Sequence, residues 1–362
     1  MIRLLLALLV LALAGPLHAQ EAEVISADTV DRLQPAVRID FASAPPEAGE
    51  IISGGFAMSR DGTRIAVRNR NNAIVVWSSD GEVLDVFSVP GADGLPDTVL
   101  DTSFNRDGSL LAAIVSDGAF YALAVRDLRQ QVTMVLPFLH SPDVPLRVWF
   151  DATEPYLWLE VAAAEPGEPA YIARIPYILP VQQLTEAAIV TQPSAAESDP
   201  ASFARFGRIA PPFAVTANQE GEVNVWNLET GKALAQAKVD GFPVFGGLNA
   251  AATHLAWREP DYAALHLLNL ETGEDRMVAR LDDDYINYIL VSPEADVILG
   301  VHVGDEPIIA AWDVATGERT DLGAYRECSR TPDMARLSGD GTTVVVGCDT
   351  GLDIWRVQPE GD

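Results

Sequence analysis

The stretch "AVTANQEGEVNVWNLETGKALA", Ala214 to Ala235, contains three short hydrophobic segments separated by polar turns, with Trp226 near the end of the middle segment. Short apolar segments bounded by Gly-containing polar turns predict antiparallel β-strands. Similar stretches recur along the chain. A repeat of fixed period determines an architecture more reliably than any local secondary-structure pattern does, so the whole fold is interpreted from this repeat.

Seven related segments each combine an apolar run, a polar turn and an apolar triplet, which predicts two antiparallel strands joined by a tight connection. They are "FAMSRDGTRIAV" from Phe56, "TSFNRDGSLLAA" from Thr102, "VWFDATEPYLWL" from Val148, "ARFGRIAPPFAV" from Ala204, "GGLNAAATHLAW" from Gly246, "YILVSPEADVIL" from Tyr288 and "ARLSGDGTTVVV" from Ala335. A third strand follows each pair. Its matching positions are Trp77, Val125, Arg174, Trp226, Leu268, Trp312 and Trp355, spaced 42 to 52 residues apart.

Six of these third strands are followed by a turn and a fourth strand, as in "NLETGKALAQA" and "NLETGEDRMVA". Four strands at this period form the blade of a β-propeller. We therefore expect an all-β protein, a seven-bladed propeller of four-stranded antiparallel blades. The tryptophans recur regularly inside strands, so we interpret them as packing residues between blades rather than as a binding surface.

These units resemble the WD-repeat family and its looser relatives over about Gln34 to Gln358. The similarity rests on the turns Ser59–Gly62 and Ser338–Gly341 and on the third-strand endings "VWSS", "VWNL", "AWDV" and "IWRV". Only Trp312-Asp313 spells the Trp-Asp pair of the family. The Gly-His pair is missing from every unit, which puts the buried hydrogen-bonded tetrad of the family in doubt.

The seventh unit stops after its third strand, "LDIWRVQ", whereas a strand-like segment, Ala36 to Ala42, precedes the first unit. The resemblance implies that this N-terminal segment completes the last blade, and closure removes an exposed strand edge. Upstream, Asp28 or Thr29 is the expected start of a short capping turn or helix. We predict a cap segment over 20–35, one propeller domain over 36–358 and a tail over 359–362. A surface loop or linker at about 186–201 joins blades three and four, with an interdomain hinge as the alternative.

The N-terminus, "MIRLLLALLVLALAGPLHAQ", has a basic residue, an apolar run from Leu4 to Ala14 and small residues before a cut after Ala19. This pattern predicts a secretory signal peptide over 1–19. The run is short for a membrane-spanning helix, and no later stretch approaches the roughly 20 apolar residues that such a helix needs. We expect a secreted protein, extracellular or periplasmic, with no membrane span after cleavage. The alternative is an uncleaved membrane anchor.

The charge of the chain restricts its partners. It has 362 residues, with 52 Asp and Glu against 24 Lys and Arg, and a formal net charge of −28. Such a charge repels phosphate backbones and anionic lipids, so nucleic acid is not an expected partner. We expect a monomer that binds a protein or peptide.

No motif predicts a catalytic residue, a cofactor or a catalytic metal. The run Asp282-Asp283-Asp284 supplies oxygen ligands suited to calcium, but no EF-hand spacing surrounds it, and solvated loop residues are the simpler interpretation. The histidines lack zinc-binding spacing, and no nucleophile motif occurs. Catalytic triads are assembled in space, so an enzyme is not excluded.

The only cysteines are Cys328, in the connection that enters blade seven, and Cys348, at the end of the second strand of that blade. In a propeller these two places lie on the same face. Export to an oxidising compartment predicts a disulfide between them, and two reduced thiols are the alternative.

The function expected from these features is an exported, non-catalytic binding platform. Alternatives are an exported hydrolase or oxidoreductase with its site at the central channel, and a structural subunit of an envelope or extracellular assembly. We expect binding at the face formed by the connections between second and third strands and those between blades, with Arg68, Arg70, Arg258 and Tyr262 as the strongest candidates. The acidic candidates on that face are Asp117, Asp305 and Asp349.

Overall fold

The computed structural model describes residues 22–360 except for a set of short segments. These are 50, 52–54, 70–72, 90–97, 117–120, 139–143, 152–153, 163–170, 177–187, 191–204, 207–212, 218–220, 228–231, 240–243, 260–262, 282–285, 303–307 and 326–333. The signal peptide predicted over 1–19 lies outside the described residues. No helix in the described part of the chain is long and apolar enough to cross a membrane.

The strands of the described residues form seven antiparallel sheets of four strands each. The first three sheets contain β2 (Phe56–Met58), β3 (Arg64–Arg68), β4 (Ala73–Ser78) and β5 (Val83–Ser88); β6 (Thr98–Phe104), β7 (Leu110–Ser116), β8 (Tyr121–Asp127) and β9 (Val132–Phe138); and β10 (Val144–Phe150), β11 (Tyr156–Ala162), β12 (Tyr171–Pro176) and β13 (Ala188–Val190). The next two contain β14 (Arg205–Phe206), β15 (Phe213–Ala217), β16 (Glu222–Asn227) and β17 (Lys232–Lys238); and β18 (Val244–Leu248), β19 (His254–Arg258), β20 (Ala264–Asn269) and β21 (Asp275–Arg280). The last two contain β22 (Ile286–Val291), β23 (Val297–His302), β24 (Ile308–Asp313) and β25 (Arg319–Ala324); and β26 (Met334–Leu337), β27 (Thr343–Cys348), β28 (Gly351–Val357) and β1 (Leu33–Asp40).

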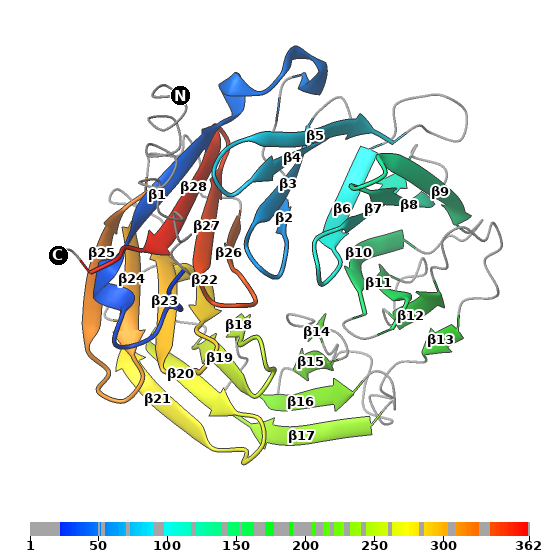
Figure 1. The fold of residues 1–362 in the computed structure, drawn as a ribbon. Helices are drawn as coiled ribbons and strands as arrows, with labels where there is room; N and C mark the ends of the chain where they lie inside the picture. The colour runs from blue at the N-terminus through cyan, green and yellow to red at the C-terminus, as the bar shows by residue number, and fades with distance from the viewer. Residues whose placement is uncertain are drawn as a thin grey trace, which may run out of the picture.

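The sheets stand in a ring, as Figure 1 shows, and a cavity lined by their inner strands marks the central channel. The first strand of each unit faces the channel, and its last strand lies at the rim. The seven repeat segments found in the sequence coincide with the first two strands of the seven sheets. The expected all-β propeller architecture is therefore confirmed.

The ring is closed by the N-terminal strand, as expected. β1 pairs with β28 along its length, from Leu33 opposite Val357 to Asp40 opposite Gly351 (Figure 1). The strand begins three residues before the predicted segment, and the chain then leaves it through a 3-10 turn at Phe41–Ser43. The approach is so close that a Cβ at Gly351 would lie 2.2 Å from the backbone oxygen of Ile39, so only glycine fits there.

The turn before the closing strand agrees with the sequence-based expectation, whereas the segment 186–201 differs from it in part. A 3-10 turn, Val30–Arg32, precedes the closing strand, and Thr29 is the residue before it, as predicted. The range 186–201 was expected to be a loop, but Ala188–Val190 forms the short strand β13 and pairs with β12. A single-sequence pattern misses this strand because it has only three residues.

The core of the ring consists of apolar side chains packed between neighbouring sheets. Trp77, Trp312 and Trp355, on third strands, are almost completely buried. Trp77 stacks on Phe41, with ring centroids 6.0 Å apart. Large aromatic side chains bury extensive apolar surface, so these three residues stabilise the contacts between sheets, as their recurrence predicted.

The turns after the inner strands share a hydrogen-bond pattern. The Ser338 hydroxyl donates to Asp340 Oδ1 at 2.6 Å and accepts the backbone N–H groups of Thr342 and Thr343 at 3.1 and 3.0 Å. In the same way, the Ser59 hydroxyl donates to Asp61 Oδ1 and accepts the backbone N–H of Arg64. Neighbouring turns also touch, because Asp340 N donates to the backbone oxygen of Arg60 at 3.1 Å. We call the surface made by these turns the turn face.

Candidate binding site in the central channel

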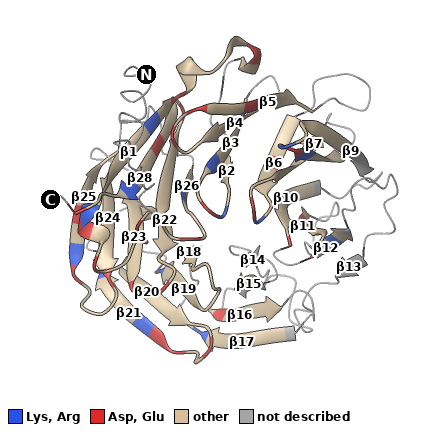
Figure 2. Ribbon diagram, viewed as in Figure 1, with Lys and Arg blue, Asp and Glu red and all other residues tan. Residues whose placement is uncertain are grey.

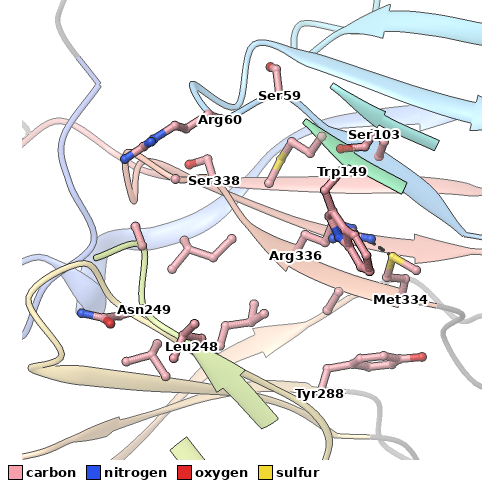
Figure 3. Close-up of a pocket in the computed structure, with 18 of the residues that line it drawn as sticks. Ser59, Arg60, Ser103, Trp149, Leu248, Asn249, Tyr288, Met334, Arg336 and Ser338 are labelled. Carbon is pink, nitrogen blue, oxygen red and sulfur yellow. Dashed lines mark hydrogen bonds between the residues drawn. The ribbon is translucent and has the colours of Figure 1, made fainter. Parts of the chain in front are cut away.

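A cavity of about 610 Å³ occupies the central channel and reaches the turn face (Figure 3). Its wall comes from β2, β6, β10, β18, β22 and β26, together with residues of the adjoining turns. The wall is mixed in character. Apolar and aromatic side chains alternate with hydroxyl, amide and charged groups. Its apolar and aromatic members include Met58, Trp149, Leu248, Tyr288 and Met334.

The inner strands position these groups by simple alternation. In a β-strand successive side chains point to opposite faces, so every second residue of an inner strand can face the channel. Around the fifth and sixth sheets the strands approach very closely. A Cβ at Gly246 in β18 would lie 2.2 Å from the Cβ of Ile289 in β22, so the absence of a side chain at Gly246 allows this contact.

Basic residues outnumber acidic ones on the inner strands, whereas acidic residues predominate in the whole chain. Acidic residues outnumber basic ones by more than two to one overall. The inner strands that the structure describes carry three arginines, Arg147, Arg205 and Arg336, and a single acidic residue, Asp101. Figure 2 shows the acidic residues spread over turns and rim instead. Arg147, Arg336 and Asp101 line the cavity, as does Arg60 at the turn face.

Arg336 lies deep in the channel, beside Met334 (Figure 3). Its Nε donates to the backbone oxygen of Phe56 and also contacts Met334 Sδ, both at 3.0 Å. Its terminal Nη groups have no hydrogen-bond partner among the described residues. Burial lowers the pKa of Arg336, the carboxyl group of Asp101 raises it, and the like charge of Arg147 lowers it further. Arg336 is thus held by one side of its guanidinium and presents the other to the cavity.

Arg147 enters the cavity from β10, with its side chain 50% exposed. It lies opposite Glu160 of β11 in the sheet register, and its Nε is 3.6 Å from Glu160 Oε2. That distance makes an ion pair but not a hydrogen bond. Glu160 Oε2 is buried without a hydrogen-bond partner. Burial raises the pKa of Glu160, and Arg147 opposes that shift.

Asp101 is the acidic residue of the channel wall. Its Oδ2 accepts the backbone N–H of Val148 at 2.9 Å, which ties β6 to β10. Burial raises the pKa of Asp101, while this hydrogen bond and the charge of Arg336 lower it less strongly. No ion pair within 4 Å joins Asp101 to Arg147 or Arg336. Asp101, Arg147 and Arg336 therefore line one cavity without forming ion pairs with one another.

The arrangement is suited to binding a polar or anionic group. Two guanidinium groups offer unused N–H donors, and aromatic and thioether side chains line the same space. Within the described residues, no group of three or more His, Cys, Asp or Glu side chains could hold a metal ion. The calcium candidate Asp282–Asp284 lies outside those residues, so it stays untested.

Of the residues expected from the sequence to bind a partner, the described ones, Arg68, Arg258 and Asp349, do not line this cavity. Arg68 Nη1 donates to the backbone oxygen atoms of Val99 and Leu100, the latter at 2.8 Å, and so joins the first two sheets. Arg258 is only 9% exposed. Asp349 lies in the turn between β27 and β28. The remaining candidates lie outside the described residues: Arg70, Asp117, Tyr262 and Asp305. Partner binding by these residues stays a prediction.

Only one of the two cysteines of the predicted disulfide lies in the described part of the chain. Cys348 ends β27 and is 3% exposed, whereas Cys328 lies outside the described residues. The disulfide therefore stays a prediction.

Arg147 and Arg336 were not among the site residues expected from the sequence. A weak signal exists, because each is the charged residue in an otherwise apolar first strand, "VPLRVWF" and "MARL". Arginine at a channel-facing position of an acidic protein is unusual enough to be singled out once the seven first strands are aligned.

Comparisons with known proteins support the fold. No protein-family model matches the sequence, and no curated protein matches it. Among many solved structures that match, the β-propeller domain of Cps50 (Swd1) from Myceliophteria thermophila has a TM-score of 0.59 and 12% sequence identity. The match covers 85% of this chain and 98% of that domain. At this identity the likeness concerns the fold alone. The chain has the β-propeller fold, and WD-repeat membership stays a prediction from its motifs.

Proposed function

We propose that this protein is an exported, non-catalytic β-propeller that binds a protein or peptide partner and serves as a rigid platform. The observation that carries the proposal is the cavity of about 610 Å³ in the channel of a closed ring. Cavities of roughly 300–1,000 Å³ are typical of ligand sites, and a rigid scaffold lowers the cost of ordering on binding. The ring and the channel together suit recognition.

Two further features support the details of the proposal. The N-terminal pattern of a basic residue, an apolar run and small residues favours export. The net charge of −28 disfavours nucleic acid and anionic membranes as partners. A protein or peptide is the remaining class that a propeller surface commonly binds.

One observation favours a second candidate, an exported enzyme acting at the channel. Burial raises the pKa of both Asp101 and Glu160. Raised carboxyl pKa values are common among general acids and bases, although structural carboxyl groups can show them too. This candidate requires turnover of a bound molecule, which the platform does not.

The platform is tested by capture from the native envelope or culture fluid, followed by identification of the captured protein and recombinant rebinding. Saturable binding of a purified partner without chemical change supports the platform. Chemical conversion of the bound molecule favours the enzyme. Absence of any saturable partner in both fractions rejects the platform.

The binding face is tested with two variants. The double variant Arg70→Ala/Tyr262→Ala changes the face predicted from the sequence, and Arg147→Gln changes the channel. We choose these because Arg68 and Arg258 are buried or bonded to the backbone, and their loss would disturb the fold. The variant that weakens rebinding of the purified partner identifies the face.

A further inference from the structure

We propose that the central-channel cavity binds the carboxylate group of an organic ligand, which Arg336 and Arg147 hold between them. The inference deepens the proposed binding function by giving the chemistry of the ligand. It rests on the two arginines, on the wall around them and on the charges nearby.

Arg336 and Arg147 have more hydrogen-bond donors than the protein uses. A guanidinium has five N–H donors, and Arg336 uses only its Nε for protein acceptors among the described residues. Arg147 makes no hydrogen bond there and has only the 3.6 Å ion pair with Glu160. The guanidinium of Arg336 in particular needs a further acceptor, because burying an incompletely paired charge is costly. Water can serve in the free protein, and a ligand oxygen replaces it.

The charges in and around the cavity decide which anion the two arginines bind. Planar guanidinium groups match the two oxygens of a carboxylate, and they also match phosphate. Asp101 lines the same cavity, and Glu160 lies beside Arg147. Doubling the charge of the ligand doubles both its attraction to the two arginines and its repulsion by the two acids, so these local charges nearly cancel for either anion. The net charge of −28 of the whole chain repels a doubly charged phosphate twice as strongly as a singly charged carboxylate, and it therefore favours the carboxylate.

The apolar and aromatic wall of the cavity indicates what the rest of the ligand is. Trp149, Met334 and Tyr288 contribute aromatic and thioether surface to the cavity (Figure 3), and Met58 also lines it. Such surface binds apolar groups, and methionine adapts to their shape. The ligand therefore combines one carboxylate with an apolar or aromatic body. A small organic acid and the C-terminus of a peptide share this chemistry.

The experiment uses isothermal titration calorimetry on the full-length mature protein with matched pairs of probes. The first pair is 4-phenylbutyrate and 4-phenylbutyramide, which differ in charge and hardly in shape. The second is the peptide acetyl-GGAFL with a free and with an amidated C-terminus. We expect at least one acid to bind roughly 10-fold or more tightly than its amide, since hydrogen bonds from a guanidinium to a charged oxygen are stronger than those to a neutral one. The pair that shows this preference identifies the source of the carboxylate.

Variants of the channel test the two arginines. We expect Arg336→Gln and Arg147→Gln each to weaken binding of the acid roughly 10-fold and to leave the amide unchanged. Asp101→Asn removes the negative charge from the wall and should strengthen binding of the acid. Arg129→Gln is the matched control, because Arg129 is exposed at the turn after β8 and does not line the cavity. If Arg336→Gln fails to fold, the half-exposed Arg147 carries the test.

Two results would overturn the inference: equal affinity for acid and amide in both pairs, or unchanged acid binding in a folded Arg147→Gln variant. Neither result concerns the platform, because partner capture is measured separately. Loss of the charge preference with partner capture retained would reject the carboxylate alone. Preference for the acid with conversion of the probe would retain the carboxylate and reject the non-catalytic platform.

Discussion

The carboxyl groups of the turn face and those of the channel differ in how they are bonded. Asp61 in a turn accepts hydrogen bonds from the Ser59 hydroxyl at 2.6 Å and from the Thr63 N–H and hydroxyl at 3.1 and 2.9 Å. Partial burial opposes these bonds, but they hold the pKa of Asp61 below its ordinary value. Glu160, beside the channel, leaves one oxygen buried without a hydrogen bond, and its pKa is raised.

This difference separates two uses of polar residues in one fold. In the turns, each donor meets an acceptor a few residues away, so these groups stabilise the ring. In the channel, charged groups are brought together from distant strands and are left partly unpaired. Incompletely satisfied polar groups lower stability, and they are often kept where a ligand completes them. We expect changes in the ring to alter stability and changes in the channel to alter binding.

The largest expected effect breaks the ring itself. Deleting residues 33–40 removes β1 and leaves β28 with an unpaired edge, which can associate with other chains. We expect aggregation or partial unfolding, measured by size-exclusion chromatography with light scattering and by thermal melting. Deleting residues 359–362, beyond β28, is the control and should change neither. An unchanged melting temperature and monomer fraction in the first deletion would mean that β1 does not close the ring.

The next effect concerns the predicted disulfide of the last sheet. Closing a loop of about 20 residues between Cys328 and Cys348 should contribute roughly 3 kcal/mol in the chain-entropy model. Reduction should therefore lower the free energy of unfolding by about that amount. Reduction should not affect a Cys328→Ser/Cys348→Ser double variant. Mass spectrometry of the unreduced protein with both thiols free would reject the bridge.

A pair of serine substitutions compares the two regions directly. Ser338→Ala removes the acceptor of two backbone N–H groups in a turn where Ser338 is only 3% exposed, so we expect a loss of about 1–3 kcal/mol. Ser103→Ala in the channel removes only a 3.4 Å contact with a backbone oxygen, and we expect a change within about 0.5 kcal/mol. Urea denaturation measures both. Equal losses would contradict the division between ring and channel.

The smallest expected effects are those of Asp61→Asn and Asp101→Asn, which should change the free energy of unfolding in opposite directions. The lowered pKa of Asp61 contributes stability above the ordinary value of 3.8, and this stability is lost as the pH falls through the folded-state pKa. The raised pKa of Asp101 costs stability above its folded-state pKa, and the cost disappears as the pH falls toward 3.8. At pH 7, Asp61→Asn should therefore destabilise the protein and Asp101→Asn should slightly stabilise it. Both differences should shrink in acid, as measured by urea denaturation from pH 7 to pH 3.

The ring could be predicted from the sequence because its determinants are local and repeated. Turns such as Ser59–Gly62 and strands such as Ala73–Ser78, with its Trp77, recur in similar form, so each copy supports the others. The closing strand followed from the missing fourth strand of the last unit. Its start at Leu33 did not follow, because Pro35 interrupts the alternating pattern at that end.

The channel could not be predicted in the same way. Arg147 and Arg336 are 189 positions apart in the sequence and share no motif. Their meeting depends on the ring bringing β10 and β26 to one cavity, and on which side of each strand faces inward. Arg68 and Arg258 were chosen for their residue type and loop position. Arg258 is buried and Arg68 is bonded to the backbone of the next sheet, and a single repeat unit shows neither environment.

The pairing of β1 with β28 also constrains when the protein can finish folding. Leu33 and Val357 are neighbours in the sheet, although nearly the whole chain separates them. The strand that is synthesised first therefore has no partner until the last one emerges. If the chain crosses a membrane in an extended form, the edge of β1 must stay unpaired for the full duration of transport. Protection of that segment by a chaperone during export would then matter more than protection of any later strand.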